Sequence, residues 1–406
     1  MTITLPATSH DETRSPDLTE PATHLRPEMA EFWRTRRQRQ PIFRHEATAH
    51  RPGFWVVCTH EPAMRIYRDA TRFTSQRGNV LLTLLAGRDN AAGKMLAVTD
   101  PPRHNLLRRL MTPALTREAV RALTCRIRER TARLLAQWAG SGEFDFADEI
   151  VSRIPIWTIC DLLGIPDSEH ELLVSLTKQA LSSDDAAQSA TSALAARQEI
   201  LLCLLDQVQA QRQHPAEGLI AGLIDAEFEG APLTDDQIVT NCYSIILGGD
   251  ETARLTMINA VHAFAADPEL WRRFGAVDDL GTAVEEIIRC FAPTMHFGRI
   301  ANVDVDIDGV RIEAGDIVTM WNISANRDER RFPDPDTVLF DRRPNPHLAF
   351  GYGPHFCIGA PLARLEIAIV LDELRRTTRN IVATAPPRPL YSNFLHGYAT
   401  LPVAFG

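Results

Sequence analysis

The chain has 406 residues, of which 45% are apolar, and its 43 Lys and Arg against 52 Asp and Glu give a net charge of −9. This acidic balance gives the surface no overall attraction to nucleic acid or anionic lipid, and the ordinary apolar content excludes disordered and fibrous chains. No apolar run reaches the roughly 18 to 20 residues that span a bilayer, and no apolar signal core stands near the start. We therefore expect a cytoplasmic, monomeric protein that binds neither nucleic acid nor membrane.

The elements predicted along the chain form one mainly α-helical domain with a small β-rich part. Residues 1–27 are polar and Pro-rich and are expected to be a mobile tail, so the domain should cover 28–406. Residues 28–38 have helical periodicity, and residues 54–58 are apolar and β-prone, which predicts a strand. Apolar residues at three- and four-residue spacing predict further helices at 117–139, 166–181, 187–212, 235–265 and 268–291.

Strand signals return in the C-terminal part. Apolar residues alternate with aspartates after residue 302, and Asp308-Gly309 predicts a tight hairpin turn. The segment 332–346 is rich in Pro, Asp and Arg, which predicts an irregular coil. A helix is expected at about 359–376 and a last strand at 401–403.

Among the seven cysteines, only Cys357 has surroundings that suit chemistry. No Cys-x-x-Cys pair is present, so neither a zinc site nor a disulfide framework is expected. Gly351 and Gly353 precede Cys357 and Gly359 follows it, just ahead of a predicted helix. Glycines let the backbone turn and approach a flat ligand, and the positive end of a helix favours a thiolate. The spacing fits a metal-bound thiolate; the alternative is an inert cysteine in a strand-loop-helix turn.

One longer pattern contains this cysteine, and its members are Phe350, Gly351, Gly353, His355, Cys357 and Gly359. The pattern resembles the haem-binding signature of the cytochrome P450 family. That resemblance implies the cytochrome P450 fold, haem b as cofactor and Cys357 as the proximal ligand of the iron. It further implies that Phe350 packs near the sulfur and that His355 meets a haem propionate.

Gly248 and Gly249 stand side by side within the predicted helix 235–265. Each should cost about 1 kcal/mol relative to alanine in a helix interior, so a compensating contact is expected. One interpretation is close packing between helices, and the other is a ligand pressed against the backbone. The resemblance favours the second, because it implies that both glycines border the haem where dioxygen binds.

An acid and a hydroxyl, Glu251 and Thr252, follow these glycines and could form a proton relay. The alternative is that Asp250 and Glu251 are simply solvated charges. Successive helical residues point about 100° apart, so the two acids cannot both face one ligand. The resemblance implies that Glu251 is the acid and Thr252 the hydroxyl of the family's oxygen-activation site.

Candidate partners for the two haem propionates are His104, Arg108 and Arg299. His104 and Arg108 are four residues apart on one predicted helical face, and guanidinium and imidazole groups form strong hydrogen bonds with carboxylates. Without the resemblance, all three are ordinary surface charges. With it, Arg299 stands where the family has a propionate-binding arginine.

Glu286 and Arg289 form an i, i+3 pair that in most helices is a weak surface ion pair. The resemblance implies instead the family's structural ion pair, Glu-x-x-Arg. Its third member should be an arginine from the irregular coil, and Arg342 fits best, with Arg343 as the alternative.

The resemblance implies a monooxygenase that uses dioxygen and two electrons to hydroxylate or epoxidise a small organic substrate. A separate ferredoxin and its reductase are the expected electron donors, and Arg103, Arg109 and Arg364 would suit an acidic partner. Oxidative coupling or desaturation is the alternative reaction, and a non-enzymatic haem sensor the alternative class. The pattern is similar to enzymes that tailor natural products, so polyketides, terpenoids and free or carrier-bound amino acids stay open as substrates.

Residues expected to line the substrate pocket flank Pro293 and the last turn-rich segment, and they are Thr294, Met295, His296, Phe297, Asn393 and Phe394. A hydrogen-bonding group beside the haem could hold a polar substrate, and His296 is such a group. The alternative is that His296 is a structural histidine with satisfied nitrogens.

Overall fold

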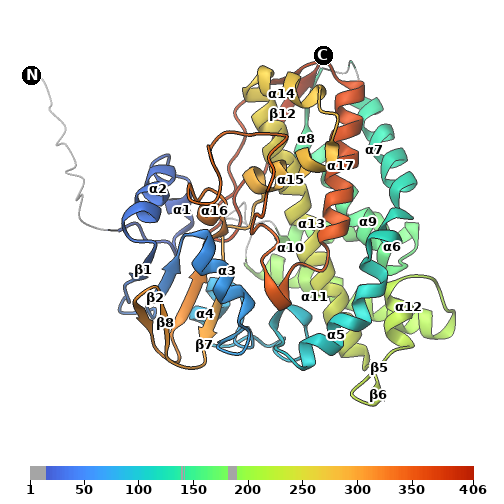
Figure 1. Cartoon of the computed structure of the whole chain (residues 1–406). Helices are drawn as coiled ribbons and strands as arrows, with labels where there is room; N and C mark the ends of the chain where they lie inside the picture. Colours follow the sequence, from blue (N-terminus) through green and yellow to red (C-terminus); the bar gives the residue numbers. More distant parts are fainter. Residues whose placement is uncertain (1–14, 139, 141, 182–189) are drawn as a thin grey trace, which may run out of the picture.

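The computed structural model describes residues 15–138, 140, 142–181 and 190–406. Its centre is α13 (Asp235–Ala266), a helix of 32 residues that runs through the molecule (Figure 1). Thr234 caps this helix, because its hydroxyl accepts the N–H of Gln237 at 3.3 Å while the Gln237 side chain accepts the N–H of Thr234 at 2.9 Å. This reciprocal cap fixes the start of the predicted helix 235–265.

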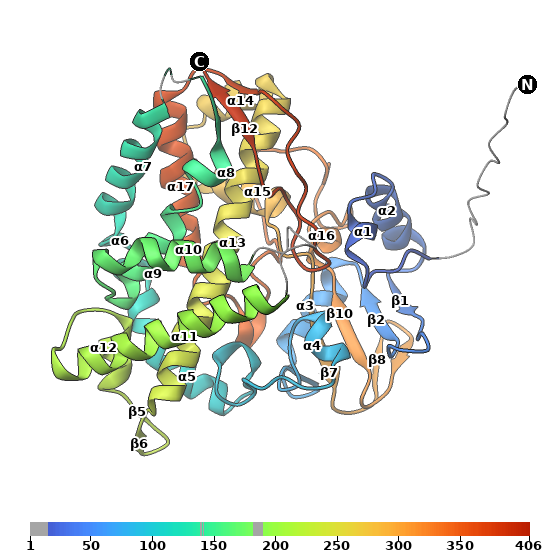
Figure 2. The ribbon, with the colours of Figure 1, turned by 180° about the vertical axis from the view of Figure 1, so that it is seen from behind.

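Other helices pack around α13 and form the larger part of the fold. In direct contact with it are α9 (Ile154–Leu163), α11 (Ala190–Gln213), α14 (Pro268–Gly275), α15 (Leu280–Phe291) and α17 (Ala360–Thr377). Figure 2 shows α11 crossing α13. The same body contains α5 (Arg103–Met111), α6 (Arg117–Arg121), α7 (Thr124–Trp138), α8 (Phe146–Glu149), α10 (His170–Leu181) and α12 (Leu219–Ile224).

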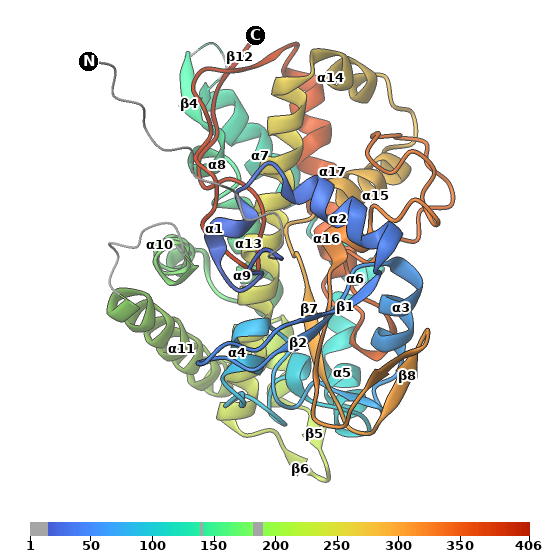
Figure 3. The same cartoon turned by 90° about the vertical axis from the view of Figure 1, so that its left-hand side faces the viewer.

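A mixed sheet with strand order β1-β2-β10-β7-β3 lies beside the helical body. Figure 3 views the molecule from the side of this sheet, with β1, β2 and β7 labelled. Its strands are β1 (Ile42–His45), β2 (Phe54–Val57), β3 (Phe73–Thr74), β7 (Phe297–Ala301) and β10 (Ile317–Met320). Short helices accompany it: α1 (Pro21–His24), α2 (Met29–Arg39), α3 (His60–Arg68), α4 (Leu81–Leu85) and α16 (Asn322–Ala325). Because β7 pairs with both β10 and β3, Arg299 on β7 is held in a fixed place.

Smaller strand pairs complete the β-rich part. They are β8 (Val305–Ile307) with β9 (Val310–Ile312), β5 (Glu227–Phe228) with β6 (Ala231–Pro232), and β12 (Pro402–Phe405) between β11 (Ile381–Ala383) and β4 (Glu143–Asp145). The predicted hairpin turn between β8 and β9 is confirmed, since Asp308 and Gly309 have φ values of 54° and 82°. The mainly α-helical fold with a small β part is therefore as expected.

Several boundaries differ from the predictions. The predicted helix 268–291 is two helices, α14 and α15, because Asp279 accepts the N–H of Thr282 at 3.2 Å and starts a new helix. The predicted helix 117–139 is likewise divided into α6 and α7. Within the described residues, no helix combines the length and apolar character needed to cross a bilayer.

The folded chain also starts earlier than residue 28. Residues 1–14 of the expected tail lie outside the described residues, but Leu18 is fully buried and the carbonyl oxygen of Thr19 accepts a hydrogen bond from Asn393 at 2.7 Å. One buried leucine and a hydrogen bond to its neighbour's backbone thus anchor a segment whose overall composition is polar.

Candidate active site

The loop before α17 holds Cys357 by its backbone. Gly351 and Gly353 have φ values of 68° and 71°, which favour glycine. A Cβ at Gly353 would lie 2.7 Å from the carbonyl oxygen of Tyr67, so a larger residue cannot fit there. The loop then turns back, and the N–H of Cys357 donates to the carbonyl oxygen of Phe350 at 2.9 Å. Gly351, Gly353 and Phe350 therefore fix the position of Cys357 through the backbone of the loop.

The sulfur of Cys357 stands at the N-terminal end of α17. Burial raises the pKa of this thiol, while backbone N–H groups of Gly359 and Ala360 and the charges of Arg108 and Arg364 act in the opposite direction. The N–H donors and the cations stabilise the thiolate, and a metal ion bound in place of the proton would stabilise it further. The site thus suits a metal-bound thiolate.

The two glycines of α13 have different surroundings. Gly248 is exposed within this central helix, and no atom would lie within 4 Å of a Cβ at that position. A Cβ at Gly249 would lie 2.9 Å from Cδ1 of Ile159 on α9. Gly248 therefore faces open space, whereas Gly249 allows close packing of two helices. Of the two interpretations of this pair, the ligand applies to Gly248 and helix packing to Gly249.

Thr252 lies one turn after Gly248, with its side chain partly buried. Its hydroxyl donates to the carbonyl oxygen of Gly248 at 2.6 Å. Glu251 is buried and lies 3.6 Å from a guanidinium nitrogen of Arg254. Asp250 is buried toward Thr177 of α10, and burial raises the pKa of its carboxyl. The two acids thus have different partners, as helical geometry requires.

Near the Cys357 loop, several predicted propionate partners come together. The rings of His104 and His355 are 4.3 Å apart, and Nε2 of His104 is buried with no hydrogen-bond partner among the residues that the structure describes. Arg299 is 4% exposed, and within the described part of the chain its guanidinium donates to the neighbouring carbonyl oxygen of Gly298, at 2.7 Å. Nε2 of His355 lies 3.8 Å from a carboxylate oxygen of Asp100, whereas among the described residues no carboxylate lies within ion-pair distance of Arg108 or Arg299.

These donors fit a cofactor that carries carboxylates, as haem does. A buried polar atom without a partner costs roughly 1–3 kcal/mol, so Nε2 of His104 favours a hydrogen-bonding ligand at this place. Burial lowers the pKa of His355 to about 4, although the nearby Asp100 opposes that change. An imidazole of this kind stays neutral and can donate to a propionate through one ring nitrogen.

The predicted structural triad is formed with Arg342. Glu286 and Arg289, both buried, lie 2.7 Å apart, and Nε of Arg342 is 3.0 Å from the same carboxylate. Arg343 is exposed and pairs with Asp279 instead. The triad ties the irregular coil to α15 directly before the Cys357 loop.

Of the six predicted pocket residues, two are partly exposed and four are buried. Phe297 and Phe394 are partly exposed, and their rings lie 5.8 Å apart. Thr294 is 8% exposed and forms an isolated bridge with Leu395. The remaining three are buried in contacts within the protein: Met295, His296 and Asn393.

His296 is fully buried and does not fit a substrate contact in this structure. Its ring is 4.5 Å from that of Trp321 and 5.7 Å from that of Phe394. Side chains alternate along an extended chain, so His296 points away from the face that carries Phe297 and Arg299. Burial lowers its pKa to about 3, and neither ring nitrogen has a hydrogen-bond partner in the described ranges 15–138, 140, 142–181 and 190–406. Neither sequence interpretation matches, because the nitrogens are not satisfied either.

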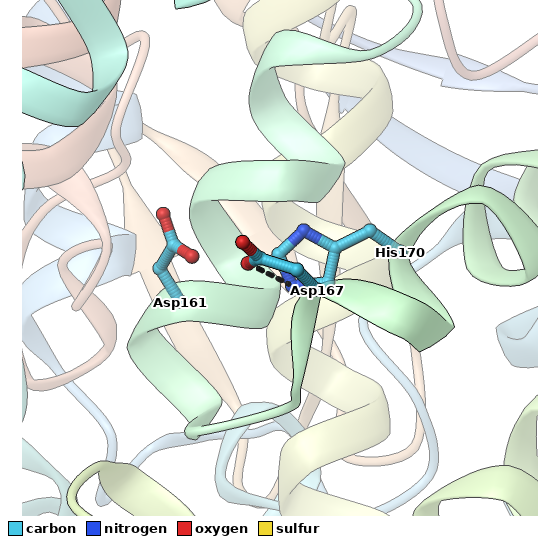
Figure 4. Close-up of side chains that lie close together, drawn as sticks. All are labelled: Asp161, Asp167 and His170. Atoms are coloured by element: carbon cyan, nitrogen blue, oxygen red, sulfur yellow. Dashed lines mark ion pairs between the residues drawn. The ribbon is translucent and has the colours of Figure 1, made fainter.

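A second group of possible metal ligands lies away from Cys357. Asp161, Asp167 and His170 come within ligand distance of one another (Figure 4). Both carboxylates already pair with two arginines: Arg130 is 2.7 Å from Asp161, and Arg126 is 2.8 Å from Asp167. Two positive charges oppose a cation, so this group is an ion-pair network between α7 and the α9–α10 connection.

Sequence reasoning missed a set of contacts that joins Glu285, His347 and Arg364 next to the cysteine loop. Glu285 accepts from Arg364 at 2.5 and 2.9 Å and lies 3.1 Å from Nε2 of His347. The guanidinium carbon of Arg364 is 4.6 Å from the centre of the Phe350 ring. The only available signal was that Glu285 directly precedes the Glu-x-x-Arg pair.

Comparison with known proteins bears on this arrangement. The family model described as Cytochrome P450 matches residues 280–377, which include the ion-pair triad and the cysteine loop. "Cytochrome P450 NovI" of Streptomyces niveus is 37% identical over 401 residues, which cover 98% of each chain. This chain belongs to the cytochrome P450 family. It is therefore a haem-containing P450 oxidoreductase.

Solved structures agree with the cytochrome P450 fold. P450 OxyD, described as involved in the biosynthesis of vancomycin-type antibiotics, has a TM-score of 0.88 and 32% identity, covering 96% of this chain and 99% of that one. HmtN, described as a post-tailoring hydroxylase in himastatin biosynthesis, has a TM-score of 0.83 and 30% identity, covering 96% and 100%. This P450 is thus a relative of enzymes of secondary metabolism.

Proposed function

We propose that this P450 is a haem-thiolate monooxygenase of natural-product biosynthesis that works in the cytoplasm and binds haem b through Cys357. The observation that carries the proposal is the position of a donor-stabilised sulfur near two arginines, the buried Arg299 and the half-buried Arg108, with no carboxylate partner among the described residues, and near the unpaired Nε2 of His104. His104, Arg108, Arg299 and His355 would hold the propionates. A thiolate-ligated haem supplies the activation of dioxygen for insertion of one oxygen atom into a substrate.

The chain's own groups would position the reactants and deliver protons. Gly248 leaves space against α13, and the Thr252 hydroxyl, now donating to Gly248, can turn to donate toward that space. Glu251, which lies 3.6 Å from the guanidinium of Arg254 and is oriented by it, would relay protons from solvent. Phe297 and Phe394 are the predicted pocket residues that a substrate can reach.

Hydroxylation is the reaction we favour over coupling or desaturation. HmtN is described as a hydroxylase, and a relative from Mycobacterium tuberculosis, 33% identical over 361 residues, is described as a methyl-branched lipid omega-hydroxylase. Electrons would come from a ferredoxin and its reductase. Arg109 is available for docking, whereas Arg103 already pairs with Glu229 and Arg364 with Glu285.

The experiment begins with a titration of the ferric, haem-loaded protein against free terpenoids, macrolides and amino acids, and against carrier-linked aminoacyl groups. A compound that shifts the Soret band is then incubated with ferredoxin, reductase and ¹⁸O₂. We expect a product that contains one labelled oxygen atom. Binding compounds that are coupled or desaturated without label would contradict the proposal.

A further inference from the structure

Phe350 contacts both Cys357 and the ion pair of Arg364 and Glu285. Its backbone carbonyl oxygen accepts the N–H of Cys357 at 2.9 Å. The guanidinium carbon of Arg364 lies 4.6 Å from the ring centre. A guanidinium over an aromatic face is attracted by the ring quadrupole, so the ring holds the charge near the sulfur.

Glu285 holds the guanidinium of Arg364 by two hydrogen bonds. Its two oxygens accept from Nε and Nη2 of Arg364 at 2.5 and 2.9 Å, a bidentate geometry that orients the planar group. His347 lies 3.1 Å from the same carboxylate, and its ring is 5.8 Å from that of Phe350. Arg364 and Glu285 are 33% and 29% exposed, so solvent screens the pair only in part.

The geometry points to a role for this pair in setting the reduction potential of the iron: Arg364, stacked on Phe350 and oriented by Glu285, is a positioning residue that stabilises the thiolate and the reduced state. This inference rests on the proposed ligation of iron by Cys357. It also reassigns Arg364, because a guanidinium held by Glu285 serves the sulfur rather than a docking partner.

Charge gives the sign of the effect. One-electron reduction of ferric to ferrous iron adds a negative charge to the site, so a nearby cation favours reduction and its anionic partner opposes it. Loss of the Arg364 charge should lower the midpoint potential, and loss of the Glu285 charge should raise it. In agreement with this direction, the Arg364 charge opposes the effect of burial on the pKa of Cys357.

The test is a redox titration of haem-loaded wild type, Arg364→Gln, Arg364→Lys and Glu285→Gln, each first reduced under carbon monoxide to verify its thiolate band. We expect the ferric-ferrous equilibrium to shift about threefold to tenfold toward ferric in Arg364→Gln, the order expected for one partly compensated charge at an effective dielectric constant of about 20. Glu285→Gln should shift it toward ferrous, and Arg364→Lys should remain closer to wild type than Arg364→Gln.

Arg343→Gln is the matched control, because it removes one arginine whose partners are Asp279 and Thr282 on the far end of α15. It should leave the potential unchanged. Equal potentials in wild type and both charge variants, with the thiolate band intact, would overturn this inference alone. A wild-type protein without the thiolate band would overturn the proposed function and this inference with it.

Discussion

The hydroxyl of Thr252 donates a 2.6 Å hydrogen bond to the carbonyl oxygen of Gly248, one helical turn earlier. Gly248 faces open space, so the same hydroxyl can turn away from the helix toward a bound molecule. A hydroxyl that can rotate between two hydrogen-bond partners is suited to passing a proton.

Replacing Thr252 with alanine removes this donor. Because a positioned proton donor contributes about a hundredfold or more in rate, we expect product formation in Thr252→Ala to fall by about a hundredfold. Reductant should still be consumed, with its electrons reducing dioxygen to hydrogen peroxide. The measurement is the ratio of product and peroxide to NADPH oxidised, with Thr252→Ser as control. Unchanged coupling in Thr252→Ala would refute the role of the hydroxyl.

The two adjacent glycines should respond in opposite ways to the same change. Gly249→Ala places a methyl group 2.9 Å from Ile159, and such overpacking destabilises by about 1–3 kcal/mol. Gly248→Ala meets no atom within 4 Å and should stabilise the helix by about 1 kcal/mol while narrowing the open space.

Thermal unfolding separates the two glycine variants, and the ferric spin state reports the space beside Gly248. The double variant Gly249→Ala, Ile159→Val should recover part of the lost stability. Equal losses of stability in the two single variants would contradict this assignment of faces.

The buried triad predicts a large difference between two neighbouring arginines. Arg342→Ala leaves the buried carboxylate of Glu286 with less compensation, and breaking a buried ion pair costs about 3–5 kcal/mol. Arg343→Ala removes an exposed pair with Asp279 and should cost less than about 1 kcal/mol. Denaturant unfolding, read by both helicity and haem absorbance, measures both. Similar losses would mean that the triad does not stabilise the coil.

The buried, neutral His296 predicts a dependence of stability on pH. Its pKa is about 3 in the folded protein, against an ordinary value of 6.5, and the charge facing it is that of His24. Below pH 6.5 the unfolded chain binds a proton that the folded chain does not, so stability is lost as pH falls toward 3. Between pH 6.5 and 5 this loss amounts to about 2 kcal/mol.

His296→Phe should remove that part of the dependence. The variant keeps the stacking against Trp321 and eliminates two buried nitrogens without partners. Denaturant unfolding at several pH values gives the slopes for both proteins. Parallel slopes would show that His296 titrates alike in the folded and unfolded chains.

Patterns that depend on neighbours in sequence predicted the fold and the cysteine loop well. The helix 235–265, the Asp308-Gly309 turn and the mainly α-helical class follow from local periodicity and backbone preference. The sequence favoured Arg342 over Arg343 as the third member of the triad, and the structure pairs Arg342 with Glu286 and Arg343 with Asp279.

Features that depend on which face a side chain takes could not be predicted. Gly249 packs against Ile159, which is distant in sequence, and His296 is turned toward Trp321 by strand alternation. The pair of Glu285 and Arg364 likewise joins α15 to α17. No local pattern encodes such contacts, because they arise from packing between elements.

The central claim is that Cys357 holds the haem iron as a thiolate, and the carbon monoxide difference spectrum of the reduced, haem-loaded protein tests it most directly. We expect the long-wavelength band of the family in the wild type and its loss in Cys357→Ala, with Cys58→Ala, a variant of a buried cysteine on the sheet side, retaining it. A long-wavelength band that persists in Cys357→Ala, or that is absent from a well-folded wild type, would contradict the claim.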